Sequence, residues 1–107
     1  MPEYKIYYIS RELFDSESKE DLKKYRKYTF SPGKDKVQPL KSDYTLMYED
    51  CFPDLDMEDL YVKCQNDFGE KPFEGRSMMV GDVVINNGRV YMVDEMGFYQ
   101  TEWKEEI

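Results

Sequence analysis

The dipeptide Asn87-Gly88 constrains the fold most, because it separates two apolar runs rich in β-branched residues. Residues 80–85 (VGDVVI) precede it and residues 90–94 (VYMVD) follow it. Asn-Gly between two such runs is typical of a type I′ turn, whose two central residues need positive φ angles. We therefore expect an antiparallel hairpin here. A third strand over 98–103 follows the turn at 95–97, so the C-terminal third predicts a β-meander.

Two further strands and two short helices are expected in the rest of the chain. Residues 4–9 (YKIYYI) and 44–48 (YTLMY) carry the β-branched and aromatic content of strands. Ser18 and Asp21 form a capping box for a mostly solvated helix that ends near Lys27. A loop rich in turn residues follows over 31–36.

The helix that begins at Asp56 has the clearest start signal in the chain. The Asp56 side chain is an N-cap, and Asp59 occupies the partner position of a capping box. Leu55 is placed to pack against the first turn of the helix. One apolar stripe then predicts the buried face: Leu60, Tyr61, Cys64 and Phe68.

These elements predict an α+β fold. We expect a mainly antiparallel sheet of about five strands, with a C-terminal β-meander and two short helices on one side. A chain of 107 residues supports a single core, so one domain over 1–107 is predicted. Within it lie a strand, helix and loop (1–43), an acidic strand and helix (44–74), the β-meander (75–103) and a frayed tail (104–107).

The acidic charge is concentrated in the middle of the chain. The net charge is -8, and residues 44–74 alone carry nine acidic and two basic side chains. This balance disfavours direct binding to nucleic acid or to an anionic membrane, since both rest on Lys and Arg. It fits docking on a basic protein surface, or a surface that only keeps the protein in solution. The candidate partner-binding residues are Glu49, Asp50, Asp54, Asp56, Glu58 and Asp59.

Several kinds of chemistry are disfavoured by the residues themselves. The chain has no His, which removes Ser-His and Cys-His nucleophile pairs and the usual zinc ligands. Cys51 and Cys64 form no CxxC motif, so free thiols in a reducing compartment are expected. Neither a signal peptide nor an apolar run of about 20 residues is found, so the cytosol is the expected location. No catalytic residue, metal or cofactor is expected.

Two other stretches each allow a functional and a structural interpretation. Gly75-Arg76-Ser77 lacks the spacing of a nucleotide loop, so Arg76 is interpreted as a surface residue or as the partner of Asp82. A nucleotide-processing enzyme that depends on Arg76 is the least favoured function. Five residues near the end of the meander predict either a small aromatic-lined pocket or core and turn positions: Tyr91, Asp94, Gly97, Phe98 and Tyr99.

Three motifs, in order, resemble the YodL-like domain family: MEDLYVKCQND (57–67), PFEGRSMMVGDVV (72–84) and YMVDEMGFYQ (91–100). YKIYYIS and SDYTLMYED are weaker matches, so the resemblance covers nearly the whole chain. Gly81 departs from the pattern, in which Ser is common at this position. The resemblance implies a small domain of Firmicutes phages, plasmids and conjugative elements, often embedded in large polyvalent proteins. It offers no catalytic residue to carry over.

The acidic charge and this context together lead to a functional hypothesis. We expect a non-enzymatic binding protein encoded by a phage or mobile element. It would inhibit a host nucleic-acid-targeting defence complex, such as a Cas nuclease or restriction complex, by docking acidic residues on its nucleic-acid site. The alternative is an accessory protein-interaction module of a mobile element, which binds through apolar and aromatic residues without mimicry.

Overall fold

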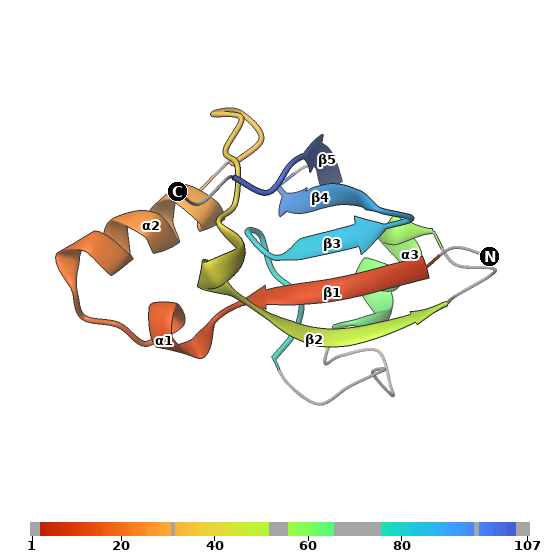
Figure 1. The fold of residues 1–107 in the computed structure, drawn as a ribbon, viewed down its shortest axis with the longest axis horizontal. Helices are drawn as coiled ribbons and strands as arrows, with labels where there is room; N and C mark the ends of the chain where they lie inside the picture. The colour runs from red at the N-terminus through yellow and green to blue at the C-terminus, as the bar shows by residue number, and fades with distance from the viewer. Residues whose placement is uncertain (1–2, 31, 52–55, 66–75, 96, 105–107) are drawn as a thin grey trace.

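A single antiparallel sheet of five strands, in the order β2-β1-β3-β4-β5, organises the molecule (Figure 1). The computed structural model describes residues 3–30, 32–51, 56–65, 76–95 and 97–104. The expected α+β class, antiparallel sheet and C-terminal meander are confirmed. The elements are β1 (Glu3–Ile9), α1 (Arg11–Phe14), α2 (Lys19–Thr29), the 3-10 helix η1 (Lys41–Asp43), β2 (Tyr44–Cys51), α3 (Met57–Lys63), β3 (Val83–Asn86), β4 (Arg89–Asp94) and β5 (Gly97–Thr101).

The hairpin between β3 and β4 forms at the predicted dipeptide. Asn87 and Gly88 have φ angles of 52° and 83°, as a type I′ turn requires. The first strand of the hairpin begins at Val83, three residues later than expected, because Gly81 has a φ of 99° and the chain turns there. β5 also ends earlier, at Thr101. Beyond it, Trp103 packs edge-on against the Tyr7 ring at 5.2 Å.

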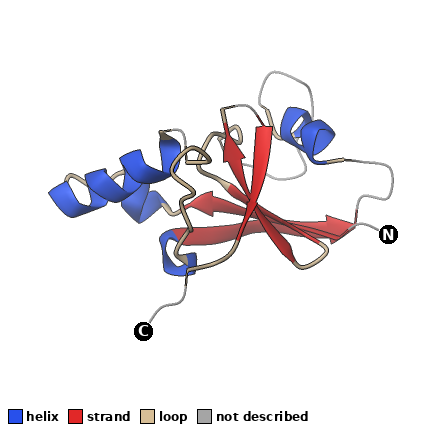
Figure 2. Cartoon of the chain, turned by 90° about the horizontal axis from the view of Figure 1, so that it is seen from above, coloured by secondary structure: helices blue, strands red, loops and turns tan. Residues whose placement is uncertain are grey.

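Both faces of the central strand β1 are buried, which corrects the expected placement of the helices. Tyr4, Ile6 and Tyr8 point into the cluster that α3 covers, whereas Tyr7 and Ile9 point into the cluster that α1 and α2 cover. Figures 1 and 2 place α1 and α2 at one end of the sheet and α3 at the other. The helices therefore do not lie on one side, because apolar residues alternate onto both faces of β1 and both faces need cover.

The N-terminal helices are set by two serine caps. The Ser18 side chain accepts a hydrogen bond from the Asp21 N–H and starts α2, as predicted. The Ser10 side chain accepts from the Leu13 N–H and starts α1, a four-residue helix that the sequence pattern did not indicate. α2 continues to Thr29, two residues beyond the expected end, and buries one side chain there, that of Tyr28.

The second strand is longer and less regular than expected. β2 runs to Cys51, so Glu49 and Asp50 lie within the strand instead of closing it. The register between β1 and β2 shifts after Ile6, which leaves Met47 as an extra residue in β2. This bulge lets Met47 and its neighbour Tyr48 pack against the same cluster.

The loop after α2 is fastened to the last strand. The Val37 carbonyl accepts hydrogen bonds from the Tyr99 hydroxyl at 2.8 Å and from the Thr101 hydroxyl at 3.2 Å. The Lys104 N–H donates to the Pro39 carbonyl at 2.8 Å, so Lys104 is held and does not belong to a frayed tail. The other three residues of the expected tail, 105–107, lie outside the described residues.

Candidate functional site

Arg76 and Asp82 form an ion pair in which Asp82 is fully buried and Arg76 is partly buried, which confirms one of the two interpretations of Arg76. The Arg76 NH1 and NH2 groups each donate to a different oxygen of Asp82 at 2.7 Å. The carboxylate is fully buried and also accepts from the backbone N–H groups of Met79 at 2.8 Å and Ile9 at 3.2 Å. The pair therefore ties the segment after α3 to the end of β1.

The electrostatics of this pair favour a permanently charged guanidinium. Burial lowers the pKa of Arg76, but the hydrogen bond and charge of Asp82 outweigh burial and raise this pKa above its ordinary value. Burial raises the pKa of Asp82, whereas Arg76 and the two backbone N–H groups lower it. Four hydrogen bonds to one carboxylate match the requirement that a buried charge be paired and solvated by the protein.

The Gly81 backbone completes a structural turn. The Gly81 carbonyl accepts a hydrogen bond from the Tyr44 hydroxyl at 2.7 Å, and a Cβ at Gly81 would lie 2.8 Å from the Tyr28 carbonyl oxygen. Gly81 and Asp82 thus hold the fold together. Gly75 lies outside the described residues, and the described part of this segment, from Arg76 to Asp82, is engaged in contacts within the fold.

Five of the six candidate partner-binding residues lie in the described part of the chain, and all five are exposed. The sixth, Asp54, lies outside the described residues, as do Leu55 and Phe68. Glu49 and Asp50 lie at the end of β2, and the other three belong to the N-cap and first turn of α3: Asp56, Glu58 and Asp59. The predicted capping is confirmed, since the Asp56 side chain accepts from the Asp59 N–H at 2.8 Å.

Four of these five carboxylates gather at one end of the sheet. Asp50 lies opposite Tyr4 in the strand register. Burial raises the pKa of Tyr4, and the negative charges of Asp56 and Asp59 raise it further, which places α3 beside the same residue. We call Asp50, Asp56, Glu58 and Asp59 the acidic surface.

Glu49 is separated from the acidic surface by the pleat of β2. The Tyr48 hydroxyl donates to Asp50 at 3.0 Å, so these two side chains share one face of the strand. Glu49 lies between them in sequence and therefore points to the opposite face. There its carboxylate lies 4.0 Å from the Lys5 ammonium. The sequence could not show this division, because it depends on where the strand ends.

An apolar pocket of about 290 Å³ lies beside the acidic surface, and we call it the α3 pocket. Tyr61 and Val62 of α3 face Phe98 of β5 across it, with Glu58 and Glu95 on its lining. The centres of the Tyr61 and Phe98 rings lie 6.5 Å apart in an edge-on arrangement, and 47% of the Val62 residue surface is exposed. The acidic surface is thus continuous with apolar side chains that a partner can reach.

The pocket expected at the end of the meander forms in part. Asp94, Gly97 and Phe98 line the α3 pocket. Tyr99 instead points to the other face of the sheet, where its hydroxyl donates to Val37. Burial is the main reason that the pKa of the Tyr99 hydroxyl is raised, and the charge of Asp94 adds to it. The pocket interpretation therefore holds for Asp94, Gly97 and Phe98, and the core interpretation holds for Tyr99.

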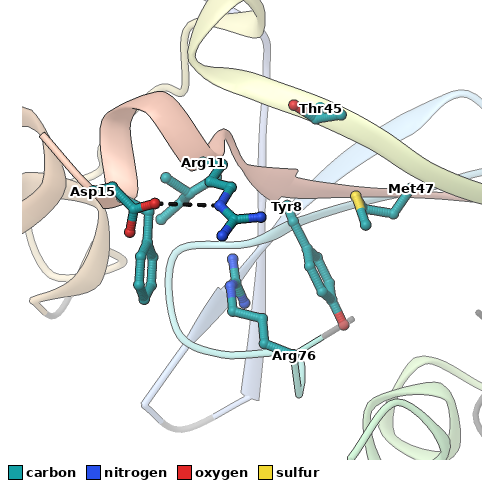
Figure 3. A pocket seen from close by; sticks show the side chains of 8 residues that line it. Tyr8, Arg11, Asp15, Thr45, Met47 and Arg76 are labelled. Carbon is teal, nitrogen blue, oxygen red and sulfur yellow. Dashed lines mark hydrogen bonds and ion pairs between the residues drawn. The ribbon is translucent and has the colours of Figure 1, made fainter. Parts of the chain in front are cut away.

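A second pocket, of about 390 Å³, lies at the other end of the sheet, and we call it the arginine pocket (Figure 3). Its residues come from four separate segments, which is why sequence reasoning missed it. They are Tyr8, Ile9, Arg11, Phe14, Asp15, Thr45, Met47 and Arg76.

Aromatic stacking shapes the floor of the arginine pocket. The guanidinium carbon of Arg76 lies 4.3 Å from the centre of the Tyr8 ring and 5.5 Å from that of Phe14. These are cation–π distances. Burial is the largest cause of the raised pKa of the Tyr8 hydroxyl, and that ring is neutral at physiological pH. Arg76 is therefore held on one side by Asp82 and on the other by rings.

Membrane-spanning helices and clusters of metal-binding side chains are both absent from the described residues. No helix among them has both the length and the apolar character needed to cross a membrane. Within the same ranges, no three His, Cys, Asp or Glu side chains are close enough together to hold a metal ion. The Cys64 side chain is fully buried in the cluster under α3, as the apolar stripe predicted.

Comparison with known proteins identifies a family for this chain. None of the curated proteins and none of the solved structures matches this chain. The family model described as YodL-like domain matches residues 3–103, which includes every strand and helix of the fold. The match covers all three sequence motifs, the buried pair and both pockets. The chain therefore belongs to the YodL-like domain family.

Proposed function

We propose that this protein is a non-enzymatic binding protein that docks its acidic surface on a basic protein surface. The carrying observation is the position of the acidic surface, whose four carboxylates are exposed at one end of the sheet beside the α3 pocket. Exposed charges steer a partner of opposite sign, and a neighbouring apolar pocket adds buried area to the contact.

The partner that this surface suits is a site already arranged for phosphate anions. We propose the nucleic-acid-binding site of a host defence complex, either a Cas nuclease or a restriction complex, with the protein encoded by a phage or mobile element. The net charge of -8 supports this, because a basic groove attracts an acidic domain as it attracts a nucleic acid. The mobile-element context that the YodL-like resemblance implies supports the choice of host defence.

Competition between this protein and DNA tests the proposal. Purified Cas and restriction nucleases are loaded with a fluorescent DNA duplex, and displacement of the duplex is measured at low and high salt. Displacement by this protein that weakens with salt is expected, because screening acts on exposed charges. No displacement from any of these nucleases at low salt would reject the mimicry proposal.

Matched charge reversals show which end of the molecule binds. Replacing Asp50, Glu58 and Asp59 together by Lys removes three acids of the acidic surface and leaves the Asp56 cap in place. The control replaces Glu12, Glu17 and Glu20 by Lys, three exposed acids at the α1 and α2 end, for the same change in net charge. Only the first variant should lose displacement; equal loss in both would show that net charge alone acts.

The α3 pocket favours a second candidate, an accessory protein-interaction module without mimicry. In that case the exposed Val62 and the Phe98 ring make the decisive contact. Phe98→Ala should then weaken partner binding, and binding should persist at high salt. The salt dependence of capture from a host lysate, compared between the Phe98 variant and the charge-reversed variant, separates the two candidates.

A further inference from the structure

We propose that the arginine pocket is a separate binding site for a small ligand that carries one carboxylate on an apolar or aromatic body. Its volume of about 390 Å³ lies within the range of small-molecule sites. Two of its lining residues, Arg11 and Phe14, belong to α1. Figure 1 shows α1 at the opposite end of the sheet from α3. The proposal therefore does not depend on the acidic surface or on its partner.

The pocket offers apolar walls to the body of such a ligand. Tyr8, Phe14 and Met47 contribute two aromatic rings and a flexible thioether side chain, and 43% of the Phe14 surface is exposed. Met47 reaches this position because it is the extra residue of the β2 bulge. Thr45 lies opposite Tyr8 in the strand register and adds one hydroxyl group.

The floor of the pocket is fixed before any ligand arrives. Arg76 is held by two hydrogen bonds of 2.7 Å to a carboxylate that is fully buried, and its guanidinium carbon lies 4.3 Å from the centre of the Tyr8 ring. Asp82 balances the charge of Arg76. A rigid floor reduces the entropy lost on binding, which is how preorganised sites gain affinity.

Arg11 supplies the group that recognises the carboxylate. Its Nε donates to Asp15 at 3.3 Å, with 94% and 59% of the two side chains exposed. Figure 3 shows the Arg11 guanidinium extended over the pocket toward Arg76 and Tyr8. In the described part of the chain, its two terminal nitrogens have no hydrogen-bond partner. A carboxylate can accept both N–H groups in a forked arrangement.

The charge of the site selects a monoanion over the other classes of ligand. A cation would meet two guanidinium groups, and the one carboxylate on the lining, Asp15, already pairs with Arg11. A phosphate dianion carries two negative charges, and the single guanidinium of Arg11 balances only one of them. It would also be repelled by a protein of net charge -8. A single carboxylate matches the single available fork.

The test uses phenylacetate and hexanoate as probes, with phenylacetamide, hexanamide and inorganic phosphate as comparisons. Each is titrated into the ¹⁵N-labelled protein and followed by two-dimensional NMR. Both carboxylates should shift the amide signals of Tyr8, Phe14 and Thr45 with millimolar affinity, as small ligands do. The amides should bind at least tenfold more weakly. Equal binding of acids and amides, or tighter binding of phosphate, would overturn the proposal.

Three variants locate the effect at Arg11. Arg11→Gln should weaken carboxylate binding at least tenfold, whereas the matched Arg26→Gln on α2 should leave it unchanged. Asp15→Asn frees Arg11 from its ion pair and should tighten binding severalfold, a gain that a misfolded protein cannot produce. Unchanged affinity in both the Arg11 and the Asp15 variants would show that the guanidinium does not hold the ligand.

Discussion

The carboxylates at the two ends of this domain differ in burial and in their hydrogen-bond partners. Asp82 is fully buried and accepts four hydrogen bonds, which join Arg76, the Met79 N–H and the end of β1. At the other end, Glu58 and Asp59 are exposed and form no ion pair with any described residue. One carboxylate is committed to the fold, and the others remain available to a partner.

The difference shows that burial, and not residue type, decides which acids can act on other molecules. A buried carboxylate must have partners inside the protein, so its removal disturbs the structure. An exposed carboxylate is solvated by water, and its removal changes the surface field with little effect on folding. Substitutions at Asp82, Gly81, Asp56 and Glu49 test this division, in order of the expected effect on stability.

Asp82→Ala should have the largest effect. It leaves the Arg76 guanidinium and the two backbone N–H groups without their acceptor in a buried site. Breaking one side of a buried pair costs about 3–5 kcal/mol of unfolding free energy. Urea denaturation measures this loss, with Asp59→Ala as the exposed comparison. A loss below about 1 kcal/mol would show that Asp82 contributes no more to stability than an exposed acid does, which would contradict the difference between the two ends.

Gly81→Ala should rank second, with Gly88→Ala as its matched control. Both glycines have positive φ, which costs an alanine about 1 kcal/mol. A Cβ at Gly81 would also lie 2.8 Å from the Tyr28 carbonyl oxygen, whereas a Cβ at Gly88 meets no atom within 4 Å. Thermal unfolding should therefore show the larger drop in Tm for Gly81→Ala. Equal drops would mean that the turn beside Asp82 relaxes without cost.

Asp56 is the member of the acidic surface that caps α3, and two substitutions separate this structural role from its charge. Asp56→Ala removes the acceptor of the Asp59 N–H and should cost about 1 kcal/mol. Asp56→Asn keeps a capping oxygen and removes the charge, so stability should change little. If the proposed docking is correct, DNA displacement should fall in both variants. A stable Asn variant with full displacement would restrict binding to the neighbouring acids.

Glu49→Gln should have the smallest effect on stability. Its partner Lys5 is 4.0 Å away and both side chains are more than one-third exposed. Exposed pairs of this kind contribute about 0–1 kcal/mol. Because Glu49 points away from the acidic surface, DNA displacement should also be unchanged. Loss of displacement in this variant would extend the docking face around the edge of β2.

Local signals predicted the parts of the fold that depend on local chemistry. Asn87-Gly88, the Ser18 cap and the Asp56 cap each specify a backbone conformation within four residues, and all three form as predicted. The helix α1 was missed because it has only four residues, too few for a periodic pattern. The early strand start at Val80 was wrong because the turn at Gly81 interrupts an apolar run without any break in composition.

The sites could be predicted only where their residues are neighbours in sequence. Asp56, Glu58 and Asp59 lie within four residues of the chain, so their grouping was visible, whereas the separation of Glu49 depends on the pleat of β2. The arginine pocket combines α1, the β2 bulge and Arg76, and no sequence pattern links segments so far apart. The pairing of Arg76 with Asp82 was foreseen as one option because the two residues lie six positions apart.

The central position of β1 makes this domain indivisible during synthesis and degradation. β1 is synthesised before its sheet neighbour β3, and the Glu3 N–H donates to the Asn87 side-chain oxygen, 84 positions later in the chain. Until that late segment is made, one edge of β1 lacks its final partner. A protease that cuts between the two strands should therefore leave no stable fragment. Within a longer polypeptide, this unit would therefore fold and unfold as a whole.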